Sequence, residues 1–212
     1  MNEHKKTFYR NQAETIIKKL HTRKMEGYYC EDRESAVSKV LELIGEGAKT
    51  VGYGGSVTID ELGLKGAIEG AGHSLIIRED VKTDEELKKV KADLINADTF
   101  LMSTNAITLD GELINIDGRG NRVSFMIYGP DQVIIVAGMN KVASDEKEGL
   151  DRVRNFASPP NTVRLNRNTP CAVTGRCGNC INDSICCQIV TTRCSMIPGR
   201  IKVVLVGEEL GY

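Results

Sequence analysis

The sequence lacks three features that would assign it at once to a broad class of protein. Its 212 residues carry a formal net charge of −1, so it has no overall basic field of the kind that non-specific nucleic-acid binders use. No apolar run approaches the roughly 20 residues needed to span a bilayer. The N-terminal segment is charged and amphipathic, without the apolar centre of a signal peptide. We therefore predict a cytoplasmic protein whose partners are neither nucleic acid nor membrane.

Histidine is scarce, and internal repeats and low-complexity tracts are missing. No two of the three histidines, His4, His21 and His73, have a metal-ligand spacing, so the sequence predicts no histidine metal site. With 41% hydrophobic residues, the chain can bury one substantial core. Its length and composition predict a single domain with an appendage.

The chain divides into four consecutive regions. We expect an N-terminal helical arm at residues 1–25, an α/β core at 26–160, a cysteine-rich metal-binding segment at 161–199, and a C-terminal strand at 200–212 that returns to the core. Apolar residues recur at three- and four-residue spacing in the first region, which indicates an amphipathic helix. Helical arms of this kind often pack on their own domain or on another subunit, and we expect a homo-oligomer.

The core region alternates short apolar runs with helical patterns of about ten to fifteen residues. Strands are expected at 50–53, 74–77, 99–102, 132–137 and 200–206, and helices at 58–69, 84–96 and 145–156. Parallel strands need such crossovers, because short turns cannot join parallel neighbours. The pattern predicts an α/β fold with a doubly wound, mainly parallel sheet flanked by helices.

Two further signals mark connections. Asp110-Gly111 is a strong turn signal and predicts a tight turn between two strands within residues 102–116. Pro159-Pro160 predicts a linker after the last helix of the core.

The first candidate site is the glycine-rich loop that follows the strand at 50–53. In an open parallel sheet, ligands bind at the carboxyl ends of strands. Glycine allows close approach of the backbone, and the start of the next helix offers unpaired N–H groups to an anion. Val57 stands where a dinucleotide fingerprint requires glycine. A plain turn capped by Ser56 is the alternative. The predicted anion-binding residues of this loop are Gly52, Gly54, Gly55, Ser56 and Thr58.

Three other strand ends carry candidate residues. Asn105 follows the strand at 99–102 and is a candidate ligand contact, while Asp110 is either a general base or part of the hairpin turn. The loop at 115–122 places two arginines and a carboxylate at the start of a helix, which favours an anionic ligand or, alternatively, a surface ion pair. The candidates in this loop are Asn115, Asp117, Arg119, Asn121 and Arg122. Asn140 and Lys141 add an ammonium group from a fourth strand end.

Six of the seven cysteines lie between Cys171 and Cys194. In a cytosolic protein such clustering favours metal ligands or redox groups over disulfides. Four thiolates hold either zinc or an iron–sulfur cluster, and a two-residue gap allows both sulfurs to face one metal. The predicted ligands are Cys171, Cys177, Cys180 and Cys186. Packed reduced thiols or an adventitious disulfide are the alternative.

The strand-end motifs resemble those of the LUD family, the lactate utilisation proteins. The similar segments are Gly52–Thr58 with Glu61-Leu62-Gly63, Thr104–Thr108, Asp110-Gly111, Asn115–Gly118, Gly120–Arg122 and Gly138–Lys141. The resemblance implies the fold of the ribose-phosphate isomerase, glucosamine-phosphate deaminase and CoA-transferase superfamily. In that superfamily, glycine-rich loops hold a phosphorylated or CoA-linked ligand. Where its isomerases carry an acidic catalytic group, this chain has Thr104-Asn105-Ala106, so Asp110 or Asp117 would have to supply a catalytic carboxylate.

Two functions are therefore expected. The resemblance implies a protein that takes part in the oxidation of L-lactate or a related 2-hydroxyacid, together with an iron–sulfur oxidoreductase, and that binds a small anionic metabolite on its strand-end loops. The alternative is a stand-alone enzyme or sensor of a phosphorylated or CoA-linked metabolite, in which the cysteines form a structural zinc site.

Overall fold

Six parallel strands form the main sheet of the computed structural model, which describes residues 1–78 and 81–212. In sheet order these are β1 (Glu26–Cys30), β10 (Ile201–Val206), β7 (Gln132–Gly138), β4 (Thr99–Met102), β2 (Thr50–Tyr53) and β3 (Ser74–Ile76). Every neighbouring pair is parallel. The predicted α/β fold with a doubly wound, mainly parallel sheet is confirmed.

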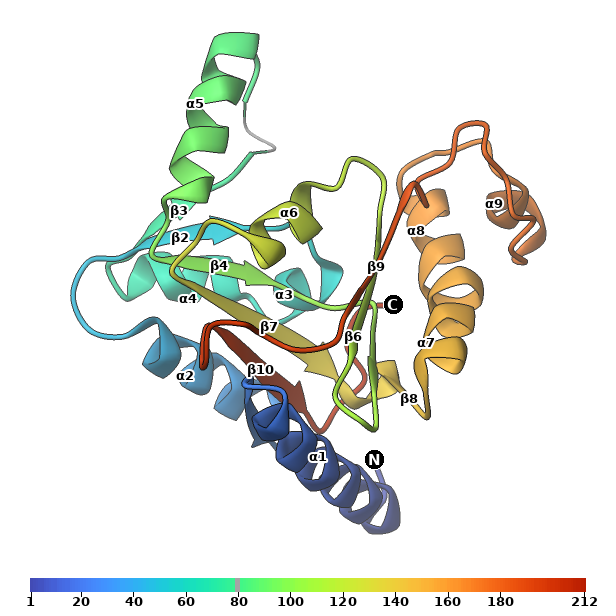
Figure 1. Ribbon diagram of the computed structural model, residues 1–212, viewed down its shortest axis with the longest axis horizontal. Coiled ribbons are helices and arrows are strands. Elements are labelled where there is room, and N and C mark those ends of the chain that lie inside the picture. The colour runs from blue at the N-terminus through green and yellow to red at the C-terminus, as the bar shows by residue number, and fades with distance from the viewer. Residues whose placement is uncertain (79–80) are drawn as a thin grey trace.

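Helices cover both faces of this sheet (Figure 1). Those against this sheet are α1 (Glu3–Thr22), α2 (Arg33–Ile44), α3 (Val57–Glu61), α4 (Leu64–Gly70), α5 (Asp84–Ile95) and α6 (Asn121–Ile127). To one side of it lie α7 (Glu146–Arg152), α8 (Ser158–Arg164) and α9 (Pro170–Thr174). The arm α1 packs on its own domain, because Ala13, Ile16 and Leu20 are completely buried in the core. No helix within the described residues is long and apolar enough to cross a bilayer.

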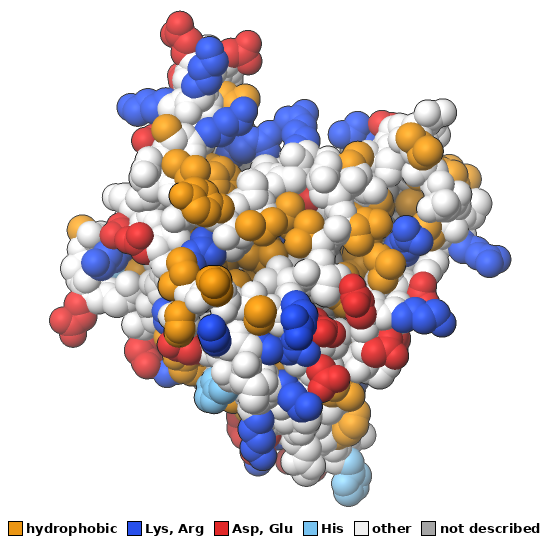
Figure 2. Space-filling view, in the orientation of Figure 1, with side chains coloured by type: hydrophobic (Ala, Val, Ile, Leu, Met, Phe, Trp, Pro, Cys, Tyr) orange, Lys and Arg blue, Asp and Glu red, His pale blue; other side chains and the backbone are white. Residues whose placement is uncertain are grey.

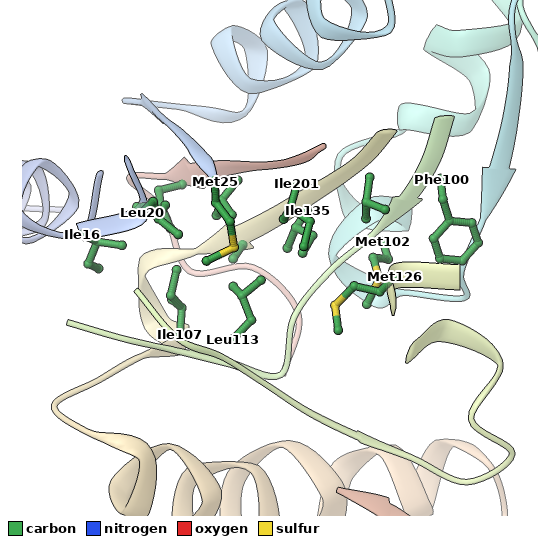
Figure 3. Packing of buried hydrophobic residues seen from close by; sticks show 14 of the residues in the cluster. Ile16, Leu20, Met25, Phe100, Met102, Ile107, Leu113, Met126, Ile135 and Ile201 are labelled. Atoms are coloured by element: carbon green, nitrogen blue, oxygen red, sulfur yellow. The ribbon is translucent and has the colours of Figure 1, made fainter. Parts of the chain in front are cut away.

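The central strands β7 and β10 are apolar except at Gln132 and Lys202, because both of their faces are covered. Along β7, Val133 and Ile135 point into one core cluster while Ile134 and Val136 point into the other. The first cluster lies between the sheet and α1, α5, α6 and a second sheet, and Figure 3 shows its packing. The second cluster lies against α2, α3 and α4.

A second, four-stranded sheet stands beside the main one. Its strands in order are β8 (Val142–Ala143), β5 (Ala106–Thr108), β6 (Leu113–Asp117) and β9 (Gln188–Thr192). The tight turn predicted at Asp110-Gly111 is confirmed, since β5 and β6 pair antiparallel around it and Gly111 has φ +82°. The sequence did not indicate β9, which pairs antiparallel with β6 although it lies in the segment assigned to the cysteines.

Two connections differ from the sequence prediction. The helix expected at 58–69 is divided into α3 and α4, because Gly63 adopts the left-handed conformation with φ +63°. The linker predicted at Pro159-Pro160 is wrong. These prolines occupy the first turn of α8, a position at which proline is tolerated. A π-helical segment, η2 (Val153–Ala157), joins α7 to α8, so the chain is helical from residue 146 to residue 164.

Candidate functional site

The carboxyl ends of the main strands point toward the helices that follow β8 (Figure 1). A cavity of about 340 Å³ lies between the loops at these strand ends and residues 153–167. The loops after β2, β4 and β7 form its floor, the loop from β6 to α6 forms one wall, and α8 with the residues after it closes the opposite side. The carboxyl ends of the strands are the usual ligand position in open α/β folds. The convergence of loops predicted from the sequence is therefore present.

Positive charge dominates the lining of this cavity. Six cationic side chains line it, namely Arg78, Arg119, Arg122, Lys141, Arg164 and Arg167. Asp117 is the one acidic side chain among the described residues of the lining. Figure 2 shows Lys and Arg side chains along the upper edge of the molecule, in the stretch between α5 and α8. The excess of cations favours an anionic ligand.

Asp117 and Arg122 form a nearly buried ion pair in the cavity wall. The Asp117 carboxylate accepts hydrogen bonds from Arg122 Nε at 2.8 Å, from the Arg122 backbone N–H at 2.9 Å and from the Val123 N–H at 3.2 Å. It thereby caps α6 and neutralises the guanidinium at the same time. These contacts give Asp117 a structural role. Its catalytic role stays a prediction.

Gly54 allows this wall to pack closely. A Cβ at that position would lie 3.0 Å from Cζ of Phe100 and 3.1 Å from Cγ of Arg122. The Arg122 side chain therefore crosses directly over the loop after β2. It also donates to the carbonyl oxygen of Ser103 at 3.1 Å, which ties the loops after β2, β4 and β6 together.

The two predicted asparagines act as a pair. Asn105 lines the cavity, and its side-chain oxygen accepts from the Ile116 N–H at 2.9 Å and from Arg122 at 3.1 Å. Asn115 is completely buried, and its side-chain oxygen accepts from the Asn105 N–H at 3.3 Å. Asn105 is thus positioned at the cavity, and Asn115 supports it from behind.

Lys141 lies at the floor of the cavity with only 3% of its surface exposed. Its Nζ donates to the hydroxyl of Thr58 at 2.8 Å and to the hydroxyl of Ser103 at 3.0 Å. No carboxylate among the described residues forms an ion pair with it. Burial, followed by the charges of Arg152 and Arg122, lowers the pKa of Lys141 to about 7, while Glu61 partly opposes this shift.

The structure places the remaining predicted residues in two groups. Gly55, Ser56, Arg119 and Asn121 line the cavity together with Thr58. Ser56 also caps α3 through the Ile59 N–H, as the plain-turn alternative required.

Three predicted residues lie elsewhere. Gly52 faces the core, where a Cβ would meet Leu94 at 2.8 Å. Asn140 holds the backbone of Leu210 through two hydrogen bonds. Asp110 lies exposed in the hairpin turn, and the hydrogen bond and charge of Lys19 hold its pKa below the usual value. The structure therefore does not bring Asp110 to the cavity, and a general base needs a raised pKa rather than a lowered one.

Several polar side chains of the lining were not among the predicted site residues, and Arg78, Ser103, Arg164 and Arg167 are four of them. Arg78 follows β3, and Ser103 follows β4, so the strand-end rule that found Asn105 was sufficient to find both. Arg164 and Arg167 come from α8 and the residues after it. No local sequence pattern indicated these two arginines. They lie at the cavity because α8 forms where the sequence predicted a linker.

The four predicted metal ligands lie in one region of the chain. All seven cysteines are free thiols. Burial raises the pKa of the Cys186 thiol, the Ser158 hydrogen bond opposes this, and the neighbouring thiols Cys171, Cys177 and Cys180 raise it further. Four thiols suit zinc or iron–sulfur chemistry. However, among residues 1–78 and 81–212 no three His, Cys, Asp or Glu side chains are arranged to hold a metal ion.

The fold and the cavity together define an α/β protein with a cavity at its strand ends that is lined mainly by cationic side chains. The chain matches the family model of the LUD domain over residues 13–206. It therefore belongs to the LUD domain family, as its motifs indicated. A search of curated proteins found no match.

A solved structure supports the fold. The chain is similar to the crystal structure of a DUF162 family protein from Deinococcus radiodurans, with a TM-score of 0.54 and 16% sequence identity. The match covers 95% of this chain and 98% of that protein. At this identity the likeness concerns the fold alone.

Proposed function

We propose that this protein binds a small carboxylate metabolite in the strand-end cavity and takes part in the oxidation of L-lactate or a related 2-hydroxyacid. One observation carries the proposal. Six cationic side chains line the cavity, while its one described acidic side chain, Asp117, is already paired with Arg122. A site with this balance favours a ligand that brings negative charge. Membership of the LUD family directs the choice toward lactate chemistry.

The arrangement suits recognition of a carboxylate. Arg164 and Arg119 are exposed at the rim and form no ion pair with the described residues. The Arg164 guanidinium donates to the neutral side-chain oxygen of Asn161 at 2.8 and 3.1 Å, and a ligand carboxylate is a stronger acceptor for the bidentate hydrogen bonds that arginine forms. The polar groups of Asn105 and Ser103 lie deeper. Electrostatic attraction is stronger in a partly enclosed cavity than in bulk water, because the effective dielectric constant is lower.

A thermal unfolding screen tests the proposal. L-Lactate, pyruvate, glycolate and inorganic phosphate are added to the protein at constant ionic strength. A ligand present at 100 times its Kd stabilises the folded state by about 2.7 kcal/mol. We expect at least one 2-hydroxyacid or 2-oxoacid to raise the unfolding temperature. Equal temperatures with and without every acid would contradict the proposal.

The cellular side of the proposal is tested separately. We propose a cytoplasmic protein that works with an iron–sulfur oxidoreductase and forms a homo-oligomer. Affinity purification under anaerobic conditions is expected to recover such a partner, and deletion of the coding region is expected to impair growth on lactate. Normal growth on lactate, in a strain without a second copy, would contradict the role in lactate oxidation.

The size of the cavity supports a second candidate. A volume of about 340 Å³ falls in the range of sites for drug-sized ligands and exceeds what lactate fills. The alternative is a stand-alone enzyme or sensor of a phosphorylated or CoA-linked metabolite, with the cysteines as a structural zinc site. Sugar phosphates and acyl-CoA compounds in the same screen distinguish the two. Stabilisation by these compounds and by none of the small acids would favour the alternative.

A further inference from the structure

We propose that Lys141 is a nucleophilic amine that forms a Schiff base with the carbonyl group of an anionic ligand, such as a 2-oxoacid. The inference rests on the proposed function, because that function brings a small organic acid into the cavity. It goes beyond it by naming a reacting residue and the chemical class of the reacting group.

The position of Lys141 is the first argument. The residue lies at the floor of the cavity, is 3% exposed, and ends a short 3-10 turn (Met139–Lys141) that joins β7 to β8. A buried lysine without a carboxylate partner is costly in its charged form. Its hydrogen-bond partners are the neutral hydroxyls of Thr58 and Ser103. These hydroxyls hold the amine in place without fixing a proton on it.

The surrounding charges are the second argument. The charged groups that act on Lys141 are the guanidinium groups of Arg152 and Arg122 and, in the opposite direction, the carboxylate of Glu61. Arg152 is held by the carbonyl oxygens of Asn140 and Asn105, and Arg122 is held by Asp117, so both cations stay close to the amine. Desolvation and an adjacent cation are the two devices that activate lysine as a nucleophile. The lowered pKa of Lys141 agrees with this geometry.

The division of charge within the cavity is the third argument. Arg119 and Arg164 stand at the exposed rim, whereas Lys141 is enclosed at the floor. A ligand that places its carboxylate at the rim arginines can direct a second functional group toward the amine. If the carboxylate itself reached Lys141, the amine would take up a proton and serve as an anchor. This role as a charged anchor is the alternative to the role as a nucleophile.

The proposed step balances without an oxidant or a reductant. The lone pair of neutral Lys141 Nζ attacks the carbonyl carbon, and the carbonyl oxygen takes a proton to give a carbinolamine. Loss of that oxygen as water, with the remaining proton leaving the nitrogen, forms the carbon–nitrogen double bond. The hydroxyls of Ser103 and Thr58, within 3.0 Å of Nζ, are placed to relay these protons.

Reductive trapping tests the proposal. The full chain is incubated at pH 7 with pyruvate or glyoxylate and cyanoborohydride, and the modified residue is located by peptide mass spectrometry. A lysine of ordinary pKa near 10.4 is neutral in only about one molecule in 2,500 at this pH, whereas an amine with a pKa of about 7 is neutral in roughly half. We expect a single adduct on Lys141. Even labelling of the surface lysines, with none in excess on Lys141, would overturn the proposal.

Three variants separate a nucleophile from an anchor. Lys141→Arg keeps the positive charge but cannot form the imine, Lys141→Met removes both, and Lys147→Met changes an exposed lysine outside the cavity lining. We expect trapping to be lost in both Lys141 variants and unchanged in Lys147→Met. Trapping that persists in a folded Lys141→Arg protein would overturn the proposal.

A calorimetric titration with L-lactate tests carboxylate binding separately from Schiff-base formation, because lactate has no ketone or aldehyde group that could react with Lys141. If lactate binds and neither oxoacid is trapped, Lys141 is an anchor and the inference fails while the proposed function stands. If neither lactate nor either oxoacid binds or is trapped, both fail. Lactate binding together with trapping on Lys141 supports both.

Discussion

At the scale of single residues, the two aspartates proposed as catalytic differ in what holds them. The side chain of Asp117 is 5% exposed and that of its partner Arg122 is 13% exposed, whereas Asp110 and Lys19 are 61% and 50% exposed. Breaking a buried ion pair costs about 3–5 kcal/mol, while exposed pairs contribute about 0–1 kcal/mol. The sequence contains Asp-Gly at both positions and could not distinguish them.

The first prediction follows from this contrast. Asp117→Asn leaves the Arg122 guanidinium without a counter-charge and is expected to lower the free energy of unfolding by about 3 kcal/mol. Asp110→Asn is the matched control and is expected to lower it by less than about 1 kcal/mol. Urea denaturation measures both. Equal effects of the two substitutions would contradict the structural role assigned to Asp117.

The second prediction concerns the pH dependence contributed by Lys141. Its folded pKa of about 7 lies below the value near 10.4 of an exposed lysine in the unfolded chain. Between these values the unfolded chain binds more protons, so the folded state gains stability as the pH rises. One pKa unit corresponds to about 1.4 kcal/mol, and the total gain is on the order of a few kcal/mol.

Lys141→Met removes this dependence. We expect its stability to exceed that of the wild type most clearly below pH 7 and the difference to shrink as the pH approaches 10. Chemical denaturation across this pH range measures the difference in the free energy of unfolding between the two proteins. Contributions from groups that titrate alike in both proteins cancel in this difference. A difference that stays constant with pH would show that the pKa of Lys141 is not lowered by burial.

At the scale of elements, apolar periodicity located the main strands because burial on both faces leaves a continuous signal. β2 and β4 begin and end where the sequence predicted, and β7 extends by one residue. A residue with positive φ is harder to predict from sequence than a buried strand. Nothing in the composition around Gly63 shows that the helix divides there. The proline pair misled for a physical reason, because proline is as compatible with the first turn of a helix as with a linker.

The third prediction concerns the cysteine segment, whose thiols we predicted as metal ligands. The protein is purified anaerobically and analysed for iron, sulfide and zinc. An iron–sulfur cluster gives a brown protein that bleaches in air, and zinc gives a colourless one. Cys177→Ser is expected to remove the metal, whereas Cys194→Ser, which changes an exposed thiol outside the predicted set, is expected to retain it. Neither iron nor zinc above trace would return the thiols to the alternative of packing or a disulfide.

At the scale of the whole molecule, the sequence predicted where the cavity forms but not how it closes. The strand-end loops converge because the carboxyl ends of parallel strands lie at one edge of the sheet. The far wall depends on the continuous helical run from α7 through η2 into α8, which places Arg164 and Arg167 beside the strand ends. That closure is a tertiary property without a local pattern. The same holds for β9, whose residues are half exposed and show no strand periodicity.

The central claim is that the cationic cavity binds a small organic anion, and calorimetric titration tests it most directly. The acid that stabilises the wild type most is titrated into the wild type, into the double variant Arg119→Gln/Arg164→Gln, and into Arg193→Gln, which changes an exposed arginine outside the lining. A hydrogen bond to a charged group contributes about 1.5–3 kcal/mol, so we expect the double variant to bind at least about tenfold more weakly. Arg193→Gln is expected to bind like the wild type. Equal affinity in all three proteins, or no binding to the wild type, would contradict the account.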